Sequence, residues 1–276
     1  MNAASLPYTV LVLLVELAAG SLAMLTVFDA RRQVTVGYVK AGAMLVLPLA
    51  LLAVWTVTTL QPRAAVDGYA LAEDWLRPFT IALTAFVACA VAHTVAAFTQ
   101  RHRAGVVLGV TGSLVGVAVL VLLAGFLALP AWSFVGLVLS ILASTTVLGG
   151  ALMAMTWGHW YLTSGRLPKE PMEQMALVVF VALGVQAALV LAGAVLPVRE
   201  APLSDGADIA LMANPAFWLR VGVGLVFPIG VTWLAFKAAQ IRGMMSATGL
   251  LYIALGAVLA GEVLARGLLF TTGRAV

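Results

Sequence analysis

Residues 247–270 read ATGLLYIALGAVLAGEVLARGLLF, an apolar run that contains two charged residues, Glu262 and Arg266. A helix crosses the hydrocarbon core of a bilayer with about 20 mostly apolar residues, so this run predicts a membrane span. Charged side chains at that depth are costly unless they are paired or face a polar cavity. Their i,i+4 spacing places both on one face of the helix, where they can pair directly. We therefore expect this span to contain a polar site.

The composition assigns the whole chain to the same class of protein. Apolar residues make up 63% of it and charged residues 9%, against roughly 25% charged residues in a soluble domain. The single cysteine, Cys89, excludes disulfide frameworks and Cys-ligated clusters. We expect an all-α polytopic membrane protein, one integral membrane domain over residues 1–276, packed as two four-helix bundles. The eight expected spans are residues 8–28, 41–60, 78–98, 105–129, 133–162, 174–196, 215–237 and 247–270.

The basic residues in the short loops predict the orientation in the membrane. Most of them lie near the loops that follow the first, third, fifth and seventh spans, whereas the opposite loops are richer in acidic residues. We therefore expect the first set of loops to be cytoplasmic and both termini to be extracytoplasmic. The net charge of +4 reflects this topology and does not indicate a nucleic-acid partner. The basic set is Arg31, Arg32, Lys40, Arg101, Arg103, Arg166, Lys169, Lys237 and Arg242.

Several polar residues lie inside the expected spans. Glu16 has no partner in its own helix, so it must be protonated, paired with another span, or facing water. Glu262 and Arg266 form either a self-neutralised pair at a helix interface or a pocket that binds a quinone headgroup or relays protons. Gln186 lies at mid-depth in the sixth span. Arg220, near the outer end of the seventh span, is expected to snorkel to the membrane surface.

A second group lies at the cytoplasmic ends of two other spans. The fifth span ends with Trp157–Tyr161, which contains His159, and the third span has His93 near the same depth. Two histidines on different helices could hold a haem b iron between them, so His93 and His159 are candidate haem ligands. His159, with Trp160 and Tyr161, could instead contact a quinone. The alternatives are structural: His93 hydrogen-bonds across helices, and the aromatic residues form an interfacial belt.

The segment Leu259–Phe270 resembles the closing helix of the dimethyl sulfoxide reductase membrane-anchor family, and more loosely that of the polysulfide-reductase-type anchors. In that family an apolar helix carries Ala-Gly-Glu, then Arg-Gly and an aromatic residue, as this chain does in Ala260–Phe270. Weaker matches are the stretch from Glu16 to Gly20 and the segment Phe217–Arg220. The Trp157–Tyr161 cluster departs from the family pattern.

The resemblance implies an anchor subunit of a respiratory oxidoreductase in the bacterial cytoplasmic (inner) membrane, without catalysis of its own. Such a subunit binds quinone or menaquinone near the outer surface, where Glu262 and Arg266 would help to build the polar interior. It exchanges electrons with an iron–sulfur subunit, which serves a catalytic redox subunit. The alternatives left open by the residues are a membrane cytochrome b, a proton-coupled small-molecule transporter, and a purely structural subunit.

Overall fold

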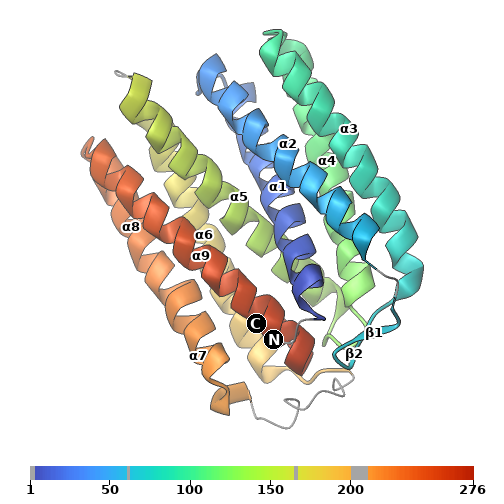
Figure 1. Ribbon diagram of the computed structural model, residues 1–276. Coiled ribbons are helices and arrows are strands. Elements are labelled where there is room, and N and C mark those ends of the chain that lie inside the picture. Colours follow the sequence, from blue (N-terminus) through green and yellow to red (C-terminus); the bar gives the residue numbers. More distant parts are fainter. Residues whose placement is uncertain (1–3, 61–62, 165–166, 200–210) are drawn as a thin grey trace.

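The computed structural model describes residues 4–60, 63–164, 167–199 and 211–276, and the chain there is almost entirely helical (Figure 1). Eight helical segments are long and apolar enough to cross a membrane, and each coincides with an expected span to within a few residues. The prediction of an all-α polytopic membrane protein is therefore confirmed. The segments are α1 (Leu6–Ala30), α2 (Val36–Thr59), α3 (Leu76–Phe98), α4 (His102–Leu127), α5 (Phe134–Ser164), α6 (Glu170–Val195), α7 with α8 (Pro215–Gln240) and α9 (Met244–Thr272).

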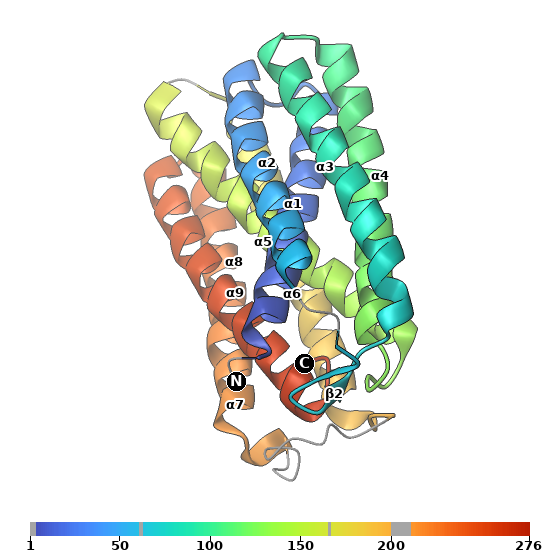
Figure 2. The same ribbon diagram turned by 45° about the vertical axis from the view of Figure 1, so that its right-hand side comes forward.

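The helices pack as two four-helix bundles, as expected. In the first bundle α1 to α4 follow one another around a ring, and α4 packs back against α1. In the second bundle α5, α6, α8 and α9 form the corresponding ring, closed by α9 against α5. The bundles meet mainly where α1 packs against α5, near the middle of the molecule (Figures 1 and 2). The first helix of each bundle therefore forms the junction between the two.

Two glycines allow α1 and α5 to approach closely. A Cβ atom added to Gly20 would lie 3.1 Å from the Cα of Gly149 and would overlap the carbonyl of Thr145. A Cβ atom on Gly149 would overlap the backbone of Gly20 and Ser21 in turn. Small residues permit this backbone contact between membrane helices, where van der Waals packing is a main source of stability.

The seventh span is not a regular α-helix. It begins as α7 (Pro215–Val221), continues as a π-helical segment (Gly222–Val226), and resumes as α8 (Phe227–Gln240). Pro228, at the start of α8, has no N–H to donate to the preceding turn, which breaks the regular hydrogen-bond ladder. A π-helical turn changes the direction of the side chains around it and is frequent at functional sites.

The loop between α2 and α3 folds over the end of the first bundle. It contains a small hairpin, β1 (Ala65–Val66) and β2 (Tyr69–Ala70), closed by two residues with positive φ. The Tyr69 side chain is fully buried, and its hydroxyl donates a hydrogen bond to the carbonyl of Leu127 at the end of α4. Burial raises the pKa of the Tyr69 phenol above its ordinary value, so the hydroxyl keeps the proton that it donates. Most of the segment between α6 and α7, residues 200–210, lies outside the described residues.

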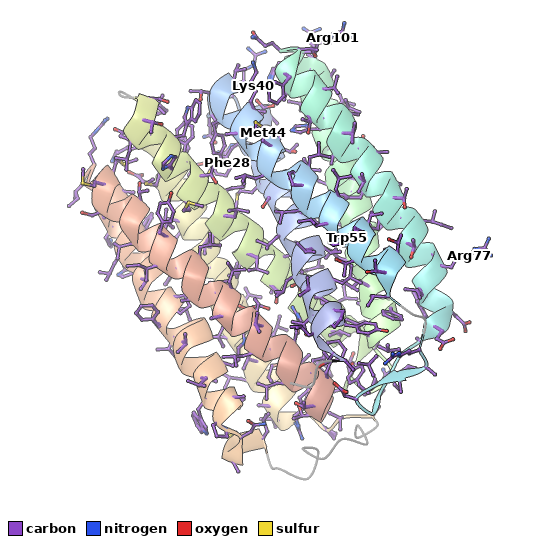
Figure 3. All side chains as sticks on the ribbon, in the orientation of Figure 1. Phe28, Lys40, Met44, Trp55, Arg77 and Arg101 are labelled. Carbon is purple, nitrogen blue, oxygen red and sulfur yellow. The ribbon has the colours of Figure 1, made fainter. Side chains whose placement is uncertain are left out.

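The two ends of the molecule differ in charge. Figure 3 shows Lys40 and Arg101 at one end and Arg77 towards the other, with Trp55 between them on α2. Between the ends, large apolar side chains such as Met44 and Trp55 are 61% and 65% exposed, so the surface of the bundles contacts membrane lipids. We name the end with Lys40 and Arg101 the basic face, and the opposite end, where both termini lie, the termini face.

The described members of the basic set lie at or next to helix ends on the basic face, as the charge pattern predicts; Arg166 lies outside the described residues. Both chain termini lie on the other side (Figure 1), as an even number of spans requires. The assignment of the basic face to the cytoplasm stays a prediction from the charge pattern.

The glycine contact between the bundles predicts a position-specific effect on stability. Gly149→Ala should lower the free energy of unfolding by about 1–3 kcal/mol, because its Cβ meets the backbone of α1, which cannot move aside cheaply. The matched control is Gly184→Ala in α6, where nothing lies within 4 Å of the added atom. That control should be neutral or gain up to about 1 kcal/mol from helix propensity. Unfolding of the purified protein in mixed micelles measures both, and equal effects would contradict the role of the contact.

Candidate functional site

Four charged side chains from three spans meet inside the protein. Glu16, Arg220, Glu262 and Arg266 are at most 3% exposed, and we call them the charge network. Arg266 Nη2 lies 2.5 Å from Glu16 Oε1 and 3.2 Å from Glu262 Oε2. Arg220 Nη2 lies 3.1 Å from Glu262 Oε1. The expected pairing of Glu262 with Arg266 is therefore confirmed, and Glu16 takes the second of its expected options, a partner on another span.

Two neutral side chains extend the network. The Gln186 amide nitrogen on α6 donates to Glu262 Oε1 over 2.6 Å and lies 2.9 Å from the Ser144 hydroxyl on α5. The site thus joins α1 of the first bundle to four helical segments of the second. Glu16 follows the start of α1 by ten residues and Glu262 precedes the end of α9 by ten residues, so both lie about 15 Å along their helices from the termini face.

Arg220 does not reach the membrane surface, and the expectation that it snorkels is wrong. Its guanidinium turns inward to Glu262, and its Nη1 also lies 3.4 Å from the carbonyl of Gly224 in the π-helical segment. Room for it comes from Gly261 on α9, where an added Cβ would lie 2.9 Å from Arg220 Nη1 and would overlap Gly224. The glycine in the Ala-Gly-Glu sequence is therefore needed where Arg220 and the backbone of the seventh span pass α9.

The ion pairs offset much of the cost of burying these charges, because an isolated charge in a low-dielectric interior is strongly destabilised. With both carboxylates ionised, the two positive and two negative charges cancel. Some buried polar atoms still have no hydrogen-bond partner among the described residues: Glu16 Oε2, Gln186 Oε1, Arg220 Nε and Arg266 Nε. Buried polar atoms in this state commonly bind water or a ligand.

A narrow pocket with a volume of about 10 Å³ adjoins the network on its termini side. Its polar lining comes from Ser140, Ser144 and Gln186 together with Arg220 and Arg266. Residues 275–276 also line it, so the end of the described chain lies across the polar groups.

Arg274 holds these last residues in place. Its Nη1 donates to the carbonyls of Gly193, Ala194 and Leu196 at the end of α6, over 2.9 to 3.1 Å. Those carbonyls have no partner within the helix, so the contact satisfies them.

An apolar groove on the lipid-facing side of α5 and α6 leads towards this pocket. The groove has a volume of about 580 Å³ and is lined almost entirely by aliphatic side chains, among them Leu139, Val181 and Val185. Leu189 lines both the groove and the polar pocket. A molecule with an apolar tail and a polar head could therefore lie along α5 and α6 with its head towards the charge network.

The structure does not bring His93 and His159 together. His93 is buried in the first bundle, with Nδ1 3.0 Å from the carbonyl of Gly105 on α4, which is the hydrogen bond across helices given above as its alternative role. His159 belongs to the second bundle, is exposed, and lies 3.3 Å from the Tyr252 hydroxyl on α9. No group of three or more metal-binding side chains occurs among the described residues.

Trp160 and Tyr161 follow His159 at the basic-face end of α5, and neither contacts the charge network. Both are partly buried against a cluster of buried apolar residues that includes Tyr38 and Trp157. The Trp160 ring also lies against Gly37 of α2. This placement fits the interfacial belt that was given above as their structural alternative.

The sequence predicted Glu16, Glu262 and Arg266 as members of a polar site and noted Gln186 only as a polar residue at mid-depth, and it missed what surrounds them. Ser144 was not distinguishable from the other hydroxyl residues of the spans. Gly224 and Gly261 were visible only as small residues. Whether a serine or glycine in a span belongs to a site can be predicted only when the helix that faces it is known.

Removing one charge of the network should destabilise the protein strongly. We expect Glu262→Gln to cost about 3–5 kcal/mol, because it leaves two buried arginines with a single carboxylate. The double variant Glu262→Gln/Arg220→Gln restores the charge balance and should lose less than the sum of the two single changes.

The control for this charge effect is Glu173→Gln. Glu173 makes a partly exposed ion pair with Lys169, 2.7 Å long, and its loss should cost about 1 kcal/mol or less. Unfolding in mixed micelles compares the variants. Additive losses in the double variant would show that the four charges do not act as one unit.

The separation of the two histidines predicts a spectroscopic result. Since α3 and α5 belong to different bundles, His93 and His159 should not share a haem iron. We expect a reduced-minus-oxidised spectrum of the purified protein to contain no b-type band that His93→Ala or His159→Ala abolishes. A band lost in both variants would contradict this arrangement.

Comparisons with known proteins add no assignment: no family model matches the chain, and neither the curated proteins nor the solved structures contain a match.

Proposed function

We propose that this chain is the membrane-anchor subunit of a respiratory oxidoreductase, and that it binds a quinone or quinol at the charge network. The observation that carries the proposal is the polar pocket next to four buried, paired charges, with an apolar groove beside it that shares Leu189 with the pocket. Small-molecule sites combine an apolar lining with a few convergent polar groups, as this one does.

The two parts of a quinone suit the two parts of this site. The isoprenoid tail is apolar and fits the groove along α5 and α6, whose lining is aliphatic. The headgroup carries two carbonyl oxygens, which accept hydrogen bonds from donors such as the arginines of the network. The pocket is narrow, so a ring reaches these donors only when side chains at its edge, such as Leu189 and Val276, move aside.

The network also offers groups for proton exchange. Oxidation of a quinol to a quinone releases two protons and two electrons, and reduction takes up the same. Glu16 has one carboxylate oxygen without a partner among the described residues, and it does not line the pocket, so it could exchange a proton with the headgroup through bound water.

The electrons need a separate carrier. The chain has one cysteine and no cluster of metal ligands in its described part, so an iron–sulfur partner subunit would take up or supply the electrons. A catalytic redox subunit would complete the complex. We place the docking surface on the termini face, because the network lies nearer to that face.

Blocking the pocket tests the proposal without changing a charge. Ser140→Trp fills the polar pocket from α5, so we expect it to weaken binding of a quinone analogue at least tenfold. Binding of a menaquinone analogue to the protein in nanodiscs can be followed by quenching of the fluorescence of the analogue.

The matched control is Val135→Trp, also on α5, where the side chain is 62% exposed and lines neither the groove nor the pocket. This variant should bind the analogue as the wild type does. Equal binding by all three proteins would remove the site from the charge network, and no binding by the wild type would overturn the proposed function.

A further inference from the structure

A second groove lies between the two bundles, on the basic-face side of the Gly20–Gly149 contact. It has a volume of about 340 Å³ and runs along α1 between α4 and α5. Ala19, Gly20 and Ala23 of α1 line it with small side chains. From Gly20 to Arg31, both of which line the groove, α1 advances by about 16 Å. That length is about half of the ~30 Å hydrocarbon core, or the depth of one leaflet.

The groove ends in a polar rim at the basic face. Arg31 lines this end and is exposed, with its guanidinium 6.0 Å from the centre of the Phe28 ring. It makes no ion pair with any carboxylate in the part of the chain that the structure describes. A positive charge at this depth, open to the headgroup region and outside any ion pair, attracts an anionic headgroup.

Two further polar groups of the groove have no partner among the described residues. Gln174 of α6 lines the same end as Arg31, and its Oε1 is buried without a hydrogen bond. Thr145 of α5, near Gly20, is 6% exposed, and its hydroxyl is likewise buried and unpaired. Gln174 can donate through its amide nitrogen to a phosphate and accept through Oε1 from a headgroup hydroxyl.

The groove between the bundles and the groove on α5 and α6 are continuous. Leu142, Thr146 and Val178 line both. An amphiphile with two chains could therefore place one chain along α1 and the other along α6, with its head at Arg31.

From these observations we infer that the groove between the bundles is a binding site for an anionic phospholipid of the leaflet on the basic face. The headgroup phosphate pairs with Arg31 and accepts a hydrogen bond from Gln174. One acyl chain lies on the small residues of α1 and packs between the bundles. The lipid thereby fills a groove along the junction that α1 and α5 form. The inference rests on Arg31, Gln174 and the groove along α1, which the proposed quinone site does not use; a second acyl chain along α6 would compete with the quinone tail for the groove on α5 and α6.

Native mass spectrometry of the purified protein tests the site with phosphatidylglycerol and phosphatidylcholine of identical chains. We expect the wild type to retain phosphatidylglycerol in preference to phosphatidylcholine. Arg31→Gln should lower the affinity for phosphatidylglycerol roughly fivefold, the factor expected for one basic residue at an anionic headgroup. Arg103→Gln, which removes an exposed charge from the same face but outside the groove, should leave the preference unchanged.

A second variant tests the contribution of the groove separately from that of the Arg31 charge. Ala23→Trp fills the groove and keeps Arg31, so it should also lose the retained phosphatidylglycerol. Thermal unfolding in lipid-free detergent checks that each variant is folded. Equal retention of the two lipids by the wild type would show only a non-specific lipid shell and would overturn the inference. Undiminished retention of phosphatidylglycerol by Ala23→Trp or by Arg31→Gln would also overturn it.

Discussion

The Glu262 carboxylate lies between two guanidinium groups, and the arrangement of the second bundle depends on this contact. A carboxylate buried in a membrane protein must be neutralised, and here Arg220 and Arg266 supply the opposite charge. The two arginines together carry one positive charge more than Glu262 neutralises. Glu16 of the first bundle offsets this charge through its ion pair with Arg266. One buried charge thus requires three more, and they connect α9 to α7 within one bundle and to α1 in the other. The hydrogen bond from Gln186 adds α6 to the same unit. Since each charge has a partner on another segment, the relative positions of these helices are specified by electrostatics as well as by packing.

Close backbone contacts make this network possible. An ion pair across helices needs the helices to approach, and membrane helices do so where their residues are small. Gly261 and Gly224 bring α9 against the seventh span at the point where Arg220 turns inward. Gly20 is one helical turn from Glu16, and its contact with Gly149 brings α1 close to the second bundle. The π-helical segment adds to this effect, because it follows Arg220 directly and supplies the carbonyl of Gly224 as a further acceptor. Packing and charge pairing therefore support each other at the same depth of the membrane.

The parts of this structure that could be predicted from the sequence are those that depend on the membrane or on a single helix. The bilayer sets the length of a span, so hydropathy located all eight segments. The pair of Glu262 and Arg266 follows from i,i+4 spacing within one helix. Contacts between helices were harder to predict, because they depend on which faces meet. Arg220 was assigned to the membrane surface from its position near a helix end, whereas the glycine on α9 and the π-helical turn direct it inward. His93 and His159 lie at similar depth, but similar depth does not imply proximity, and the two bundles separate them. The proposed functions themselves rest on the chemistry of the sites, which the fold alone does not determine.

The charge balance of the network limits what it can bind. With all four groups ionised the site is neutral, so a proton added to either carboxylate leaves a buried positive charge without a counter-charge, and a proton lost from an arginine leaves a buried negative one. A permanently charged ligand would create the same imbalance. A neutral ligand that carries exchangeable protons avoids it, because it adds no net charge to the site and a proton that moves between the ligand and the network leaves the total charge constant. A quinol has this property, so the proposed function agrees with the electrostatics of the pocket. The groove at the basic face, by contrast, favours a charged ligand. Arg31 makes no ion pair among the described residues, so the groove beside it favours an anionic ligand, and the membrane itself supplies one.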